Sequence, residues 1–112
     1  MKYPNLTNTE KLVSEELRDR LESFLGPRLL MLVLYGSKAR GDWEPGSDLD
    51  IAIVVSGLTR ELKHKILDIV AEIKFKYVMP LSTLVFLEEN FHRLREREGR
   101  IALDIEKDGI SL

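Results

Sequence analysis

Residues 29–55 read LLMLVLYGSKARGDWEPGSDLDIAIVV, and this stretch decides the fold. The apolar run 29–35 is short, continuous and stopped by a glycine, which is typical of a buried strand. A Gly-Ser pair turns the chain, a polar loop covers 38–47, and a second strand begins near residue 48 and runs to 55. The sequence therefore predicts two buried strands joined by a loop at the centre of the domain.

The second strand carries two carboxylates at its start, Asp48 and Asp50. Because successive side chains on a strand point to opposite faces, both acids share one face and Leu49 lies on the other. Like charges held this close repel, so a cation is expected to neutralise them. Mg²⁺ prefers one or two carboxylates together with water and phosphate oxygens. We therefore expect Asp48 and Asp50 to bind Mg²⁺.

The Gly-Ser pair, Gly36 and Ser37, is expected to face the same place. Glycine lets the backbone approach a phosphate closely, and adjacent N–H groups and the Ser37 hydroxyl can donate to its oxygens. An ordinary β-turn would also accept this pair. A Walker A loop is excluded because Asp42 and Trp43 stand where Lys and Ser/Thr are required, and no G-x-G-x-x-G follows a strand.

The order and spacing of these residues resemble the signature of the nucleotidyltransferases of the DNA polymerase beta superfamily, especially its minimal nucleotidyltransferase domains. That signature is a hydrophobic residue with Gly-Ser, then Ala-Arg-Gly, then Ser-Asp-x-Asp and an apolar strand. It stands here as YGS at 35–37, ARG at 39–41 and SDLDI at 47–51. Several fixed positions agree in order and spacing, so the match is specific.

The resemblance implies roles for the acids and for the turn. Asp48 and Asp50 would be the catalytic carboxylates and would hold Mg²⁺, with a two-ion site possible, to bind the triphosphate and activate an acceptor hydroxyl. Gly36 and Ser37 would hold the β- and γ-phosphates. ATP is the implied substrate.

The loop residues between these two motifs have more than one interpretation. Lys38 and Arg40 could neutralise phosphate charge during transfer. Arg40 could equally lock the loop by pairing with Asp42 or Asp48. Ser47 belongs to the predicted phosphate-binding set and is expected to orient the loop just ahead of the carboxylates.

The chain departs from the family pattern at a third carboxylate, which many members carry on a later strand beside the Asp-x-Asp strand. The corresponding strand is 81–87, where Ser82 or Thr83 occupies the expected position. Glu88 and Glu89 lie too far along to substitute. Because the third acid serves as general base for the acceptor hydroxyl, its absence should weaken the chemistry and leave nucleotide binding possible.

Helical periodicity surrounds the predicted strands, and residues that favour helix caps precede the long helical segments. Strands separated by helices indicate an α/β (α+β) domain, a small mixed β-sheet with helices mainly on one face. The resemblance implies the same fold, with a helical turn at 37–40. The expected helices are one capped by Thr7 and stopped at Gly26-Pro27, one capped by Thr59, one over 91–98 and one ended by Gly109.

Composition narrows the possible functions of the chain. At 112 residues and 44% hydrophobic content, a single domain over 1–112 is expected. The 17 Lys plus Arg and 19 Asp plus Glu give a net charge of −2, so long nucleic acid is not the expected partner. The chain has no Cys, no membrane-length apolar run and no signal-like N-terminus, and a cytoplasmic location is expected.

Two functions remain open at this point. The first is Mg²⁺-dependent transfer of AMP from ATP to a hydroxyl of a protein or small molecule. Small members of the family often work with a helical HEPN protein as a toxin and antitoxin pair, so such a partner, or a second copy, would supply recognition of the acceptor. The second is a nucleotide-binding module that docks on a partner protein without turnover, which the missing third carboxylate favours.

Overall fold

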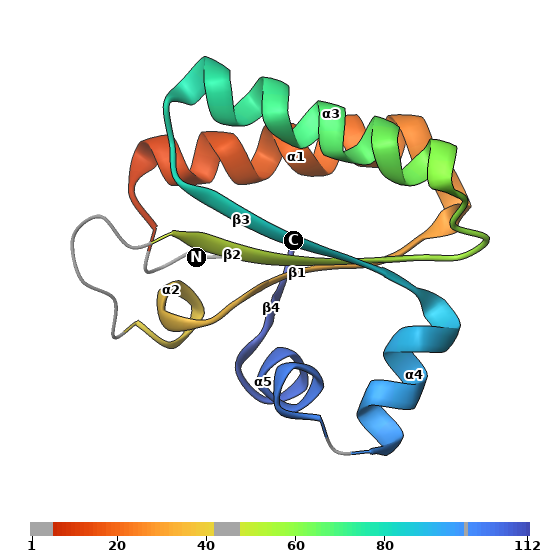
Figure 1. Ribbon diagram of the computed structural model, residues 1–112. Coiled ribbons are helices and arrows are strands. Elements are labelled where there is room, and N and C mark those ends of the chain that lie inside the picture. The colour runs from red at the N-terminus through yellow and green to blue at the C-terminus, as the bar shows by residue number, and fades with distance from the viewer. Residues whose placement is uncertain (1–5, 42–47, 98) are drawn as a thin grey trace.

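The computed structural model describes residues 6–41, 48–97 and 99–112. Four strands form a mixed sheet in the order β3-β2-β1-β4 (Figure 1). β1 pairs antiparallel with both β2 and β4, and β2 pairs parallel with β3. The strands are β1 (Leu29–Tyr35), β2 (Leu49–Val55), β3 (Leu81–Leu87) and β4 (Ile110–Ser111).

Helices cover both faces of this sheet, and the two long ones share one face. Figure 1 shows α1 and α3 on that face and the shorter α4 and α5 on the other. The predicted α/β fold with a mixed sheet is confirmed, as are its first three strands and the helical turn α2. The helices are α1 (Asn8–Leu25), α2 (Ser37–Arg40), α3 (Arg60–Tyr77), α4 (Glu88–Glu96) and α5 (Arg100–Asp108), with a 3₁₀ turn η1 (Gly26–Arg28) before β1.

The caps predicted for the two long helices are present. At the start of α1 the Thr7 hydroxyl accepts from Glu10 N–H at 3.1 Å, and the Glu10 carboxylate accepts from Thr7 N–H at 2.9 Å. At the start of α3 the Thr59 hydroxyl accepts from Leu62 N–H at 3.1 Å. Each such cap contributes about 1 kcal/mol. Among the described residues, none of the helices is long and apolar enough to cross a membrane.

The strands divide the apolar core into two layers, because alternate side chains face opposite sides of the sheet. Along β2, Leu49, Ile51 and Ile53 pack in the layer under α1 and α3. Ala52 and Val54 pack in the other layer, with residues of α4 and α5. Asp50 shares the alternation of Ala52 and Val54, so it belongs to the second face.

A buried ion pair joins α2 to α1. Lys38 Nζ lies 2.7 Å from a Glu10 carboxylate oxygen, and the two side chains are 3% and 5% exposed. The other Glu10 oxygen closes the cap of α1. Buried charges are tolerated only when they are paired in good geometry. The turn that follows the Gly-Ser pair is therefore fixed against the first helix.

We expect Lys38→Met to lower the free energy of unfolding by about 3–5 kcal/mol, because it leaves the Glu10 carboxylate buried without its cation. Lys76→Met is the matched control, since Lys76 pairs with Glu16 at a similar 2.8 Å but is 60% exposed. Exposed pairs contribute little. Urea unfolding of both variants measures the difference, and equal stabilities would contradict the anchoring role of Lys38.

Candidate active site

The end of β1 and the start of β2 bring Gly36 against Asp50. Tyr35 pairs with Asp50 in the antiparallel ladder, so the residue after Tyr35 lies beside that carboxylate. Gly36 has φ +77°, and a Cβ added there would lie 2.5 Å from Asp50 Oδ2. Only glycine suits both this conformation and this close approach. The turn and the carboxylate thus meet at one point.

Asp48 and Arg40 lie close enough to Asp50 to change its ionisation. Burial raises the pKa of Asp50, the negative charge of Asp48 raises it further, and the positive charge of Arg40 acts in the opposite direction. Asp50 is half-buried, whereas Asp48 and Arg40 are exposed. A half-buried carboxylate beside a second acid is a site that favours a cation. This donor set fits Mg²⁺, which needs only one or two carboxylates from the protein.

The register of β3 identifies the residue at the position of the missing third acid. Ser82 is the partner of Asp50 in the parallel β2–β3 ladder, and Thr83 is the partner of Ile51 on the opposite face. Of the two residues left open by the sequence, Ser82 therefore stands beside Asp50. In the described ranges, no group of three or more His, Cys, Asp or Glu is placed to hold a metal ion.

Lys38, one of the predicted phosphate-binding residues, lies against α1. Its ammonium group is buried and paired with Glu10, so its charge already has a partner, and this placement does not support a contact with phosphate. Arg40 is the cation of α2 that acts on Asp50. Ser37 begins α2, and Arg40 N–H donates to Gly36 C=O at 3.1 Å. Ser47, and the predicted pairing of Arg40 with Asp42, lie outside the described residues.

Two residues near this site were missed by sequence reasoning. Burial raises the pKa of the Tyr35 hydroxyl, and the charges of Asp50 and of Asp104 on α5 raise it further. Tyr35 could have been found, because it is the hydrophobic residue that precedes Gly-Ser. Asp104 could not, because its place beside Tyr35 follows only from the packing of α5 on β1.

We expect Gly36→Ala to destabilise the protein more than Gly57→Ala. Both glycines have positive φ, +77° and +64°, so both substitutions carry the cost of a left-handed residue, about 1–2 kcal/mol. A Cβ at Gly57 meets nothing within 4 Å, but one at Gly36 displaces the Asp50 carboxylate. Thermal unfolding measures the difference, and equal losses in the two variants would contradict the close approach.

We expect Asp50→Asn to stabilise the protein without added metal, by an amount that depends on pH. Because the folded-state pKa of Asp50 lies above its ordinary value of 3.8, the unfolded chain ionises first as pH rises, and wild-type stability is lost through that interval. The gain should be absent near pH 3 and present at pH 7. Thermal unfolding in chelator measures it, with Asp19→Asn as the exposed-acid control. A pH-independent difference would contradict this electrostatic cost.

Comparison with known proteins agrees with this geometry. A family model described as "Nucleotidyltransferase domain" matches residues 14–109. Two proteins of Methanocaldococcus jannaschii carry the name "Putative protein adenylyltransferase". MJ0141 is 31% identical over 75 residues, which cover 66% of this chain and 76% of that protein. MJ0604 is 29% identical over 102 residues, which cover 84% and 97%.

A crystal structure described as a toxin-antitoxin with AMP-PNP has a similar fold. It superposes with a TM-score of 0.57 and 17% identity, and the match covers 94% of this chain and 72% of that one. This likeness concerns the fold alone. The family model spans most of the chain, from the middle of α1 to the end of α5. The protein therefore belongs to the nucleotidyltransferase domain family.

Proposed function

We propose that this protein is a Mg²⁺-dependent adenylyltransferase that transfers AMP from ATP to a hydroxyl group of a protein. The observation that carries the proposal is the contact of the Asp50 carboxylate with the Gly36 turn, within electrostatic reach of Asp48 and Arg40. The names of the two M. jannaschii relatives support an adenylyl group and a protein acceptor. The AMP-PNP of the similar toxin-antitoxin structure supports ATP as the nucleotide.

In this proposal the two carboxylates bind the metal ion, and the Gly36 turn and Arg40 contact the phosphates. Asp48 and Asp50 would hold Mg²⁺, which when bound neutralises phosphate charge and lowers the pKa of an acceptor hydroxyl. Backbone N–H groups of the Gly36 turn would donate to phosphate oxygens, and Arg40 would stabilise negative charge on the leaving pyrophosphate. The acceptor oxygen would bond to the α-phosphorus as the bond to pyrophosphate breaks, and the hydroxyl proton would pass to a base supplied by the acceptor or its surroundings.

The neighbour of Asp50 on β3 limits this chemistry. Ser82 stands where a carboxylate could receive the proton of the acceptor hydroxyl, and a serine hydroxyl is not a base at neutral pH. We therefore expect slow turnover unless the acceptor or its surroundings supply a base. The same observation favours the second candidate function, a module that binds nucleotide and docks on a partner without turnover.

The partner we propose is a helical protein of the HEPN type, with this chain as the antitoxin. The support is the resemblance of the sequence to small family members that work in such pairs, together with the toxin-antitoxin description of the similar structure. We place the protein in the cytoplasm and regard 1–112 as one catalytic domain. We propose that the partner or a second copy contributes to recognition of the acceptor.

The test is incubation with ATP labelled on the α-phosphate, Mg²⁺ and the helical protein encoded beside this one. We expect label on the acceptor, lost by on the order of 100-fold or more in Asp48→Asn and Asp50→Asn because each removes a metal ligand. Asp19→Asn, which changes an exposed acid of α1, should retain transfer. ATP labelled on the γ-phosphate should transfer nothing.

Calorimetry separates the two candidate functions. ATP binding that requires Mg²⁺ but gives no labelled acceptor would favour the docking module. ATP binding that is equal in wild type, Asp48→Asn and Asp50→Asn would contradict both functions, because both place the nucleotide at these carboxylates.

A further inference from the structure

β3 forms one edge of the sheet, next to β2. Leu49 N–H donates to Pro80 C=O at 3.2 Å, so the backbone groups of Pro80 point toward β2. By alternation those of Ser82 and Leu84 also point toward β2, whereas those of Thr83 and Val85 point outward. No other strand of the described chain receives these outward groups.

The sequence of β3 does nothing to protect this edge. The strand reads LSTLVFL, without charge or proline, and its register with β2 is unbroken by any bulge. Soluble proteins usually protect such edges with charges, prolines or bulges, because free backbone groups pair with other strands. An edge of this kind can pair with a strand of another chain.

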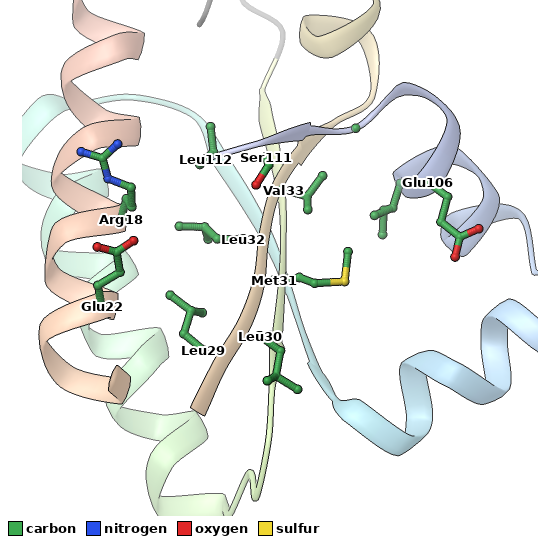
Figure 2. Close-up of a pocket in the computed structure, with 12 residues that line it drawn as sticks. Arg18, Glu22, Leu29, Leu30, Met31, Leu32, Val33, Glu106, Ser111 and Leu112 are labelled. Atoms are coloured by element: carbon green, nitrogen blue, oxygen red, sulfur yellow. The ribbon is translucent and has the colours of Figure 1, made fainter. Parts of the chain in front are cut away.

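The opposite edge of the sheet differs in this respect. There β4 pairs only with the last part of β1, and a groove runs along Leu30 and Met31. Figure 2 shows Arg18 and Glu22 of α1 on one side of this groove and Glu106 of α5 on the other. Charged side chains thus flank the β1 edge, which leaves β3 as the unprotected edge.

A second apolar surface lies on α3, and we call it the α3 stripe: Leu67, Ala71, Phe75 and Val78. These residues recur three and four positions apart, so they share one side of the helix. All four are exposed, Phe75 by 86% and Val78 by 88%. The sheet-facing residues of α3 are a different set that includes Ile66 and Ile73. The α3 stripe is therefore not part of the core.

The α3 stripe points away from α1 and toward the β3 edge. Glu72 and Lys76 pair with Arg20 and Glu16 of α1, and they lie on the other side of α3 from the stripe. A groove of about 930 Å³ connects the stripe to the start of β3. Its lining includes Ala71, Phe75, Val78, Pro80 and Leu81. The stripe and the free strand edge thus form one continuous surface.

The backbone at Val78 supports a role for this surface. Val78 has φ +49°, the left-handed region that β-branched residues rarely adopt, at a helix end where glycine is usual. Its side chain is almost fully exposed, so packing within the chain does not compensate the strain. Strain of this kind is typical of functional positions.

We propose that this protein forms a symmetric dimer in which β3 pairs antiparallel with β3 of a second copy and α3 packs against α3. A two-fold axis through Leu84 sets Thr83 opposite Val85 of the partner subunit. Both residues have outward backbone groups, so they form a hydrogen-bonded pair. Because the axis is perpendicular to the sheet, both α3 helices lie on the same face and meet beside the axis.

The same axis brings the two α3 stripes together. Leu84 lies three residues after Leu81, about 10 Å along the strand, and Ala71 lies seven residues before Val78, about 10 Å along the helix. Antiparallel packing around Ala71 then places Leu67 against Phe75 of the partner subunit. This self-complementarity is the reason that we assign the surface to a second copy.

The proposed dimer also has a consequence for the candidate active site. The groove that it covers is lined by Asp48 as well as by the α3 stripe. The second copy would therefore form a wall near the carboxylates, although the dimer does not depend on the proposed reaction. Its test needs no nucleotide.

The absence of Cys in the chain allows a direct test by single-cysteine cross-linking. In Leu84→Cys the two thiols face each other across the axis at a Cα separation of about 4.5 Å, which a disulfide can span. In Ser82→Cys, on the same face of the same strand, the two positions are about 13 Å apart. Mild oxidation should give a covalent dimer of the first variant and none of the second. Equal cross-linking of the two variants would overturn the proposed register.

Sedimentation analysis tests the dimer without cross-linking. Wild type should sediment at twice the chain mass of 12.9 kDa with a Kd of about 1 μM or below. Phe75→Lys should weaken the dimer by about 30-fold or more. Leu12→Lys, on the exposed side of α1, should not change it, and circular dichroism should show that both variants are folded. A wild type that stays monomeric up to about 100 μM, or a Phe75→Lys dimer of unchanged affinity, would overturn the proposal.

Discussion

The close approach of the Asp50 carboxylate to the backbone of Gly36 is the constraint on which the site depends. It is set by the β1–β2 register, in which Tyr35 lies opposite Asp50. A slip of one residue would turn Asp50 into the layer between the sheet and the long helices, and Leu49 out of it. That slip would bury the Asp50 carboxylate among the apolar residues under α1 and α3, and the cost of doing so opposes it. The same apolar strand that forms the core therefore holds the acid at its edge.

The two cations of α2, Lys38 and Arg40, have different surroundings. Lys38 is buried against Glu10 and holds α2 against α1. Arg40 is the cation of α2 whose charge acts on Asp50. Asp48 and Asp50 repel each other, and burial adds to the cost of ionising Asp50. The folded chain accepts this cost at a position where a bound cation would remove it. Ionised Asp50 thus lowers the stability of the metal-free protein, and the same ionised carboxylate is the form that would bind a metal ion.

Features that depend on neighbouring residues were predicted from the sequence. Contacts between elements far apart in the chain could not be predicted from it. Short apolar runs gave the positions of β1 and β3, and the Thr7 capping box gave the start of α1, because each is decided by neighbouring residues. The ion pair of Lys38 with Glu10 joins elements far apart in the chain, so no spacing rule indicates it. β4 is two residues long and exists only because β1 offers an edge. The choice of Ser82 over Thr83 likewise required the β2–β3 register.

The composition of β3 connects two features that otherwise look unrelated. Its residue beside Asp50 is Ser82, so the strand adds no third negative charge to a pair of acids that already repel. Its outer edge also has no charge, which leaves it able to pair with a strand of another chain. In the proposed register Ser82 lies opposite Phe86 of the partner subunit, where a carboxylate would be desolvated without a cation. A strand suited to covering by a second copy is therefore poorly suited to carry a catalytic base.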